Sequence, residues 1–302
     1  MMRFATVRHA GAERVGVVGD AEISLLPPIA GGLVGLIEGG APALAAVRQT
    51  LAAGQCETLA LEAAQLLAPI RRFRRDVLCT GWNYWEHFEE GVGKREGQEV
   101  ARPTAPTFFT KAPDVVIGPR DDIAYDARVS AKWDYEAEVA VVIGKEGRSI
   151  PAARAMEHVW GYCLANDVSQ RDLQRRHGGQ WFKGKSIDGT MPLGPWLVLA
   201  EDIDIAEVRL QCELNGQLMQ DALVKQMAFA IPELIAELSL GMTLRPGDVL
   251  LTGTPSGVGN AREPQVFLKA GDQVVVRGSG LGELHNTLRE TDLYGASGVV
   301  LA

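Results

Sequence analysis

The segment from Asp134 to Gly144 constrains the fold of this chain most, because two carboxylates at alternate positions lead directly into the apolar run Val139–Ile143. An uninterrupted apolar run of this length is typical of a strand that is buried on both faces. Side chains alternate along a strand, so Glu136 and Glu138 are expected on one face. The pair by itself also fits a solvated strand face, but carboxylates at the end of a buried strand require a cation. The segment therefore predicts a core sheet with a charged site at one edge.

A third carboxylate, Asp167, follows a second apolar strand that begins near Trp160. A site made of Asp167, Glu136 and Glu138 would offer only oxygen ligands, which hard cations such as Mg²⁺ prefer. In such a site Mg²⁺ would keep about three of its six positions for water or substrate oxygens. The three acidic residues are therefore candidate metal ligands.

A helix is expected directly after this carboxylate. Ser169 and Asp172 have the spacing of a capping box, and the glycines at 178–179 are expected to end the helix. Arg171 and Gln174 are three residues apart, so on a helix they would face the same way. A guanidinium and an amide on one helix face are suited to holding the carboxylate of a substrate.

His87 and Glu90 are also three residues apart, so a short helix would bring the carboxylate to the imidazole. A carboxylate that orients a histidine and raises its basicity is typical of a general base, although a surface histidine beside acidic residues is the commoner arrangement. The polar segment Glu89–Arg102 contains three glycines and is either a lid or an ordinary surface loop.

Two glycine-containing segments remain. Residues Gly179–Ser186 match the pattern of a phosphate-binding loop, but the segment Ile187–Pro195 after them cannot be helical, so we reject that interpretation. Lys185 within it is either a cation that polarises a substrate carbonyl or an exposed lysine. The loop Gly253–Gly259 is either a tight turn or an anion-binding loop in which Thr254 donates to a substrate carboxylate.

The amino-acid composition of the chain changes near residue 70, where Pro69 and a basic run follow Ala/Leu-rich segments. We expect a small N-terminal domain over residues 1–70 and a second domain over residues 71–302. The N-terminal elements expected are strands at 3–7, 14–18 and 21–26 and helices at 42–53 and 58–67. The later elements expected are strands at 114–117, 137–143, 197–199, 208–214, 249–252 and 273–276 and one helix over 227–238.

Composition limits the partners. The formal net charge is −8, which argues against a nucleic-acid surface, since phosphate binding depends on clustered Lys and Arg. The four cysteines are widely separated and do not form a zinc or redox motif, and no uncharged apolar stretch is long enough to span a membrane. We therefore expect a cytoplasmic protein whose partner is a small molecule and which binds neither nucleic acid nor membrane.

Several motifs in fixed order resemble the fumarylacetoacetate hydrolase family from about residue 76 to the C-terminus. The motifs are Asp134-x-Glu136-x-Glu138, Gly161-Tyr162 with Asn166-Asp167-Val168-Ser169-x-Arg171-Asp172-x-Gln174, Gly184-Lys185-Ser186, Gly194-Pro195-Trp196, Asn215-Gly216 and Thr252-Gly-Thr-Pro-x-Gly-Val-Gly259. The resemblance implies an α+β fold with a mixed β-sandwich or β-roll catalytic domain, a small N-terminal α/β domain as in longer bacterial members, and a homodimer.

The resemblance also implies site residues. It implies one divalent cation per subunit, Mg²⁺ or Mn²⁺, at Glu136, Glu138 and Asp167. It implies that His87, Glu90 and Lys185 are catalytic, with the His-Glu pair on a lid, and that the substrate contacts are Asn83, Tyr84, Arg171, Gln174 and Thr254. One position departs from the pattern, because Trp82 stands where many relatives have arginine, which removes a cation near the pocket.

We interpret the chain as a metal-dependent hydrolase that cleaves a carbon-carbon bond in a 2,4-dioxo acid of the acylpyruvate or fumarylacetoacetate type, in aromatic or sugar-acid catabolism. In this hypothesis His87 deprotonates a water molecule, while Lys185 and the metal stabilise the departing enolate. The alternative is a decarboxylase or isomerase of oxaloacetate-like or 2-hydroxyhepta-2,4-diene-1,7-dioate-like acids at the same site. A phosphate-loop nucleotide hydrolase and a non-catalytic diketo-acid binder are weaker alternatives.

Overall fold

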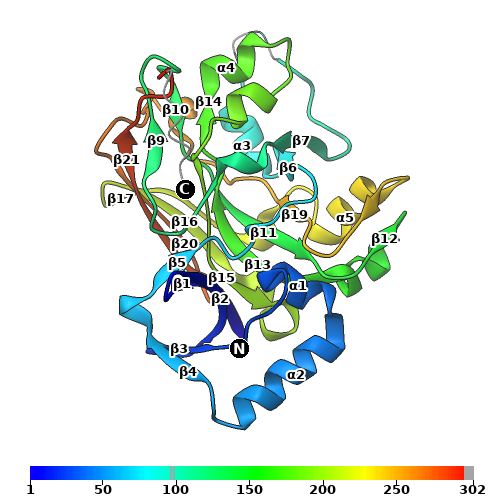
Figure 1. Cartoon of the computed structure of the whole chain (residues 1–302). Coiled ribbons are helices and arrows are strands. Elements are labelled where there is room, and N and C mark those ends of the chain that lie inside the picture. Colours follow the sequence, from blue (N-terminus) through cyan, green and yellow to red (C-terminus); the bar gives the residue numbers. More distant parts are fainter. Residues whose placement is uncertain (96, 98, 296–302) are drawn as a thin grey trace.

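The main sheet contains the predicted core strand at its centre. The structure, a computed structural model, describes residues 1–95, 97 and 99–295, and within them this sheet has twelve strands in the order β4-β3-β2-β1-β15-β13-β11-β19-β6-β7, with β5 beside β1 and β8 beside β15 (Figure 1). From its middle to one edge, its strands are β15 (Met191–Leu199), β13 (Val159–Asn166), β11 (Ala137–Ile143), β19 (Val249–Leu251), β6 (Val77–Gly81) and β7 (Thr107–Lys111). Every residue of β11 is buried, as the apolar run predicts.

The register of these strands brings the chemistry-bearing segments to one edge. Ala137 at the start of β11 pairs with Asn166 at the end of β13, and β19 runs antiparallel to β11 on its other side. Strand β6 lies parallel to β19, so both end at that edge. The helices α3 (Trp85–Glu90) and α4 (Arg171–Arg176) lie together above the same edge, at the top of Figure 1.

The first seventy residues extend this sheet. Strand β1 pairs with β15 and, through β2 and β3, continues the main sheet (Figure 1). The elements are β1 (Arg3–His9), β2 (Ala12–Val18), β3 (Glu22–Leu25), β4 (Glu57–Ala60), β5 (Gln65–Leu67), α1 (Gly32–Glu38) and α2 (Gly40–Ala52). The expected boundary at residue 70 therefore lies between segments that share one sheet.

One N-terminal prediction is wrong and one element was not predicted. The segment 58–67, expected as a helix, forms the strands β4 and β5 around a short 3₁₀ turn. Its Ala/Leu-rich composition favours a helix, but backbone pairing with β3 and β1 decides the outcome. Helix α1 was missed because its seven residues include two glycines, which lower helix propensity.

A second, five-stranded sheet packs on one face of the main sheet. It has the order β17-β16-β20-β21-β9, and one apolar core joins β11 to β16 and β20. Its strands are β17 (Gln217–Leu223), β16 (Arg209–Leu214), β20 (Gln273–Gly278), β21 (Gly282–Glu290) and β9 (Ile123–Tyr125). Both sheets mix parallel and antiparallel neighbours. The expected α+β class with mixed sheets is confirmed.

The remaining elements are short. They are β8 (Val116–Ile117), β10 (Trp133–Asp134), β12 (Gly147–Arg148), β14 (Ser169–Gln170), β18 (Thr243–Leu244) and α5 (Ile231–Ser239). Helix α5 confirms the predicted helix except that residues 227–230 precede it. The strand expected at 114–117 is only β8, since residues 113–115 form a 3₁₀ turn. In the part of the chain described here, no helix is long and apolar enough to cross a membrane.

Candidate active site

The three predicted carboxylates converge. Glu136 precedes β11 and Glu138 lies within it, whereas Asp167 follows the neighbouring strand β13. All three are buried, and one oxygen from each lies within 4.8 Å of the others. The convergence follows from the register, because β11 starts where β13 ends. The alternative of a solvated strand face is wrong for this pair.

Two buried lysines contact two of these carboxylates, Glu136 and Asp167. Lys185 Nζ donates to Glu136 Oε2 and to Asp167 Oδ2, both at 2.7 Å, so the exposed-lysine alternative is wrong. Lys111, at the end of β7, donates from the other side to Asp167 Oδ1 at 2.6 Å and to the carbonyl of Val168. Sequence reasoning missed Lys111, whose only signal is a lysine that directly follows an apolar strand segment.

The two glutamates have opposite electrostatic environments. Burial disfavours ionisation of Glu136, but the ammonium of Lys185 and the guanidinium of Arg171 outweigh it, so the pKa of Glu136 lies well below its usual range. Burial, together with the charges of Asp167 and Glu136, raises the pKa of Glu138 well above its usual range. The side chains of the protein therefore do not supply enough positive charge to stabilise an ionised Glu138. A divalent cation bound by the three carboxylates would supply that charge.

A buried arginine is fixed beside the carboxylates. Arg171, the first residue of α4, donates through Nε to Asp134 Oδ2 at 2.9 Å and through Nη1 to Gln174 Oε1 at 3.1 Å. Its Nη2 lies 2.7 Å from Glu136 Oε1. Asp134 also accepts from the backbone amides of Gly259 and Asn260. Arg171 and Gln174 share a helix face as predicted, and Asp134 is an orienting residue that sequence reasoning did not single out.

The predicted pair on the lid is formed. Helix α3 brings His87 Nδ1 to 2.8 Å from Glu90 Oε1, and Glu90 Oε2 accepts from the amide of Gly257 at 2.8 Å. Lys94 donates to the carbonyl of Ala261, which fixes the segment after α3 to the loop that follows β19. In this structure α3 and the segment after it are therefore hydrogen-bonded to the loop that follows β19.

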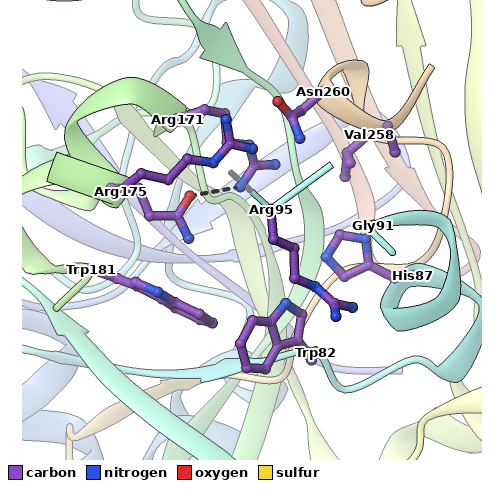
Figure 2. A pocket seen from close by; sticks show the side chains of 11 residues that line it. Trp82, His87, Gly91, Arg95, Arg171, Arg175, Trp181, Val258 and Asn260 are labelled. Atoms are coloured by element: carbon purple, nitrogen blue, oxygen red, sulfur yellow. Dashed lines mark hydrogen bonds between the residues drawn. The ribbon is translucent and has the colours of Figure 1, made fainter. Parts of the chain in front are cut away.

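Two adjoining cavities lie under this segment, and the close view in Figure 2 shows the outer one. The residues that line both cavities are Trp82, His87, Arg171, Gln174 and Trp181. The inner cavity is also lined by Glu136, Glu138, Lys185 and Thr254, and the outer cavity by Arg95, Arg175, Val258 and Asn260. His87 and the carboxylates Glu136 and Glu138 therefore face the same inner cavity.

Two of the predicted substrate contacts do not line the cavities, and the hydroxyl of a third is bonded to the backbone. The amide of Asn83 donates to the carbonyls of Thr252 and Phe229 and accepts from the amide of Phe229, so it fixes the backbone. Tyr84 is buried and, like Asn83, does not line either cavity among the described residues. The hydroxyl of Thr254 donates to the carbonyl of Ala137, at 2.9 Å, although its side chain reaches the inner cavity. Their roles toward a substrate stay predictions.

Three local predictions about loops can be compared with the structure. The capping box is wrong, because Gln170 precedes α4 and the hydroxyl of Ser169 donates to the carbonyl of Asp167. Residues 182–185 form a 3₁₀ turn, consistent with rejecting a phosphate-binding loop. In the loop after β19, the amides of Gly253 and Gly257 donate to Glu138 and Glu90. These amides therefore bind the carboxylates of the site itself.

Comparison with known proteins finds a matching family model and similar enzymes. Residues 76–289 match the family model described as the fumarylacetoacetate (FAA) hydrolase C-terminal domain. Oxaloacetate tautomerase YisK of Bacillus subtilis (strain 168) is 42% identical over 229 residues, which cover 76% of this chain and 74% of that protein. The human mitochondrial oxaloacetate tautomerase FAHD2A is 42% identical over 252 residues, covering 83% of this chain and 77% of that protein.

Solved structures agree in fold. The fumarylacetoacetate hydrolase of Exiguobacterium antarcticum superposes with a TM-score of 0.82 at 35% identity, covering 96% of this chain and 100% of that one. The 5-carboxymethyl-2-hydroxymuconate delta-isomerase of Mycobacterium smegmatis superposes with a TM-score of 0.73 at 31% identity, with coverage of 96% and 100%. The chain is therefore an enzyme and belongs to the fumarylacetoacetate hydrolase family.

Proposed function

We propose that this enzyme interconverts the keto and enol forms of oxaloacetate or a closely similar dicarboxylic 2-oxo acid, with Mg²⁺ or Mn²⁺ at Glu136, Glu138 and Asp167. The observation that carries the proposal is that His87, which is held by Glu90, lines the same inner cavity as the carboxylates Glu136 and Glu138. The relatives named oxaloacetate tautomerase favour this alternative over the carbon-carbon hydrolase.

The residues have distinct roles in the proposed reaction. Because His87 Nδ1 is held by Glu90, its Nε2 is left to take the proton from C3 of the keto form and to return it. The ammonium of Lys185 stabilises negative charge as it develops on the 2-oxo oxygen. When bound, the divalent cation would act as a Lewis acid toward the 2-oxo acid end. Glu138, Glu136 and Asp167 would hold that cation.

The charges of the site fit an anionic substrate. With all four carboxylates ionised, as binding of a metal requires, four buried carboxylates face three buried cations and leave one net negative charge. The carboxylates are Asp134, Glu136, Glu138 and Asp167, and the cations are Lys111, Lys185 and Arg171. A divalent cation would turn this into one net positive charge. Arg95 and Arg175 add positive charge along the outer cavity. A dianionic acid therefore suits the loaded site better than a neutral ketone.

Proton transfer also fits the arrangement of the cavity. Keto-enol interconversion needs one base and a stabilised enolate, whereas hydrolysis needs in addition a positioned water molecule. The contacts of Glu90 and Lys94 to the loop after β19 hold the segment around α3 beside the cavity, which is lined by Trp82 and Trp181. The aromatic lining lowers the polarity around the reacting groups, which favours proton transfer to His87 over attack by a bulk water molecule.

The experiment is product analysis with purified enzyme and Mg²⁺ or Mn²⁺. Oxaloacetate freshly dissolved in its enol form is expected to lose its enol absorbance faster with enzyme than without it. Nuclear magnetic resonance should show that the keto form is the product and that no second product is formed. Release of CO₂ would instead indicate a decarboxylase, and two acids from an acylpyruvate would indicate the hydrolase. An unchanged enol decay would contradict the proposed reaction.

We also predict that the enzyme is a homodimer, that its N-terminal residues form a separate domain and that it is located in the cytoplasm. The resemblance to the family supports the homodimer, and the mass in solution by light scattering tests it. The family model begins at residue 76, which supports a distinct role for residues 1–70. Deletion of these residues tests the separate domain, although the pairing of β1 with β15 predicts lower stability for the shortened protein.

A further inference from the structure

We propose that Arg95, on the segment that closes over the site, binds the distal carboxylate of the substrate and so selects dicarboxylic over monocarboxylic 2-oxo acids. This inference rests on the proposed function, since it names the group at the far end of the same substrate. It starts from the position of Arg95, whose side chain lines the outer cavity and lies between His87 and Trp82 in the view of Figure 2.

The guanidinium of Arg95 is buried and has no carboxylate within hydrogen-bonding distance among the described residues. Only 7% of the residue is exposed, and the nearest carboxylate described, that of Glu99, lies 3.8 Å from Nη1, beyond hydrogen-bonding distance. One amino group, Nη2, donates to the carbonyl of Phe88. The buried Nε has no hydrogen-bond partner among the described residues. An unpartnered donor on a buried charge is costly, so an anion in the cavity would stabilise it.

Aromatic rings hold this charge in place without neutralising it. The guanidinium carbon lies 4.0 Å from the centroid of the Phe88 ring and 5.3 Å from that of Trp82. Cation–π contacts of this kind fix the position of a guanidinium and leave its in-plane donors available.

The other two arginines that line the outer cavity have protein oxygens as partners. Arg171 contacts the carboxylates of Asp134 and Glu136. Arg175 donates to the carbonyl of Lys94 at 2.9 Å. Arg171 is therefore held by carboxylates of the protein, whereas the guanidinium of Arg95 has no carboxylate within hydrogen-bonding distance among the described residues, which favours Arg95 as the partner of a substrate carboxylate.

The order of groups along the cavity fits a short dicarboxylate. The inner cavity holds the acidic triad residues Glu136 and Glu138, the two cavities share His87, and the outer cavity reaches Arg95. A 2-oxo acid end in the inner cavity would therefore place C3 near His87 and the second carboxylate toward Arg95. A monocarboxylic acid would leave the guanidinium without a hydrogen-bonded carboxylate.

The test is a binding experiment with two non-reacting probes that differ only at the far end, malate and lactate, titrated calorimetrically into the Mg²⁺-loaded enzyme. Arg95→Gln is expected to weaken malate binding about 10- to 100-fold, the range for losing a charge-assisted hydrogen bond, and to leave lactate within about twofold. Arg95→Lys, which keeps the charge, is expected to lose less. Arg102→Gln is the matched control, because Arg102 stacks on Trp85 but does not line either cavity.

An equal loss for malate and lactate in Arg95→Gln would overturn the proposal, because it would show that the residue only holds the lid. Unchanged malate binding would overturn it as well. If Arg95→Gln does not fold, as a melting curve would show, Arg95→Lys decides by the same comparison. A selective loss of malate affinity supports the proposal even if oxaloacetate is not tautomerised, so failure of the proposed reaction remains distinguishable from failure of this inference.

Discussion

The ammonium of Lys185 lies 2.7 Å from Asp167 Oδ2. Both side chains are buried in the protein interior. The lysine comes from a 3₁₀ turn that follows α4, and the aspartate follows β13. The pair shows that positive charge is built into the site before any substrate enters. A charge held in place in this way stabilises an enolate without reorganisation.

Substitution of a residue of the acidic triad should weaken metal binding, whereas substitution of the base should not. Glu138→Ala removes a buried oxygen ligand, so we expect divalent-metal affinity to fall about 100-fold or more, and activity to fall with it. Calorimetric titration with Mn²⁺ measures this directly. Glu237→Ala, an exposed glutamate on α5, is the control and should bind metal normally. Full activity after metal removal by a chelator would contradict the assignment.

The lid pair should affect turnover and not metal binding. His87→Ala removes the base, so we expect kcat to fall about 10²- to 10⁴-fold while Mn²⁺ affinity stays within about twofold. Glu90→Gln should show a smaller loss, since the imidazole remains but loses its orienting carboxylate. His285→Ala, at a half-exposed histidine far along the chain, is the control. Loss of metal in His87→Ala would mean that the histidine belongs to the metal site.

Lys111 should be important for stability as well as activity. Lys111→Met leaves Asp167 buried with one fewer cation, and breaking a buried pair in this way costs about 3–5 kcal/mol of unfolding free energy. Urea denaturation measures the loss. Lys183→Met, at an exposed lysine of the same 3₁₀ turn as Lys185, should change stability by less than about 0.5 kcal/mol. Adding Asp167→Asn to Lys111→Met should restore part of the stability, and no recovery would contradict the ion-pair explanation.

The cysteines give a prediction for pH. Burial raises the pKa of Cys163 to about 12, and burial also raises the pKa of Cys79. The folded state therefore keeps thiol protons that the unfolded chain releases, so these thiols lower stability as pH rises above about 9. Melting temperatures between pH 8 and 10.5 test the trend, and Cys163→Ala should make it shallower.

Thiol labelling provides an independent check of the same burial. At about pH 8 the partly exposed Cys56 should react rapidly with a thiol reagent, whereas Cys79, Cys163 and Cys212 should react only after unfolding. Rapid labelling of more than one thiol in the folded enzyme would contradict the described packing.

The amino-acid sequence by itself determined the local parts of this site. The alternation of Glu136 and Glu138 on a buried strand, and the three-residue spacing of His87 and Glu90, follow from the periods of strand and helix, which depend only on neighbours in the chain. The ionic role of Lys111 and the backbone-anchoring role of Asn83 were decided by tertiary structure. Their partners lie 56 to 169 residues away, and no local period encodes such contacts.

Tertiary structure also decided where local propensity fails. Residues 58–67 have the composition of a helix but form strands, because the unpaired edges of β3 and β1 satisfy their backbone hydrogen bonds. The sequence likewise does not indicate that Arg95 lines a cavity or that its guanidinium packs on an aromatic ring, because both follow from the tertiary structure. A sequence specifies which groups exist and their local spacing, whereas burial and long-range pairing set the electrostatic environment in which those groups act.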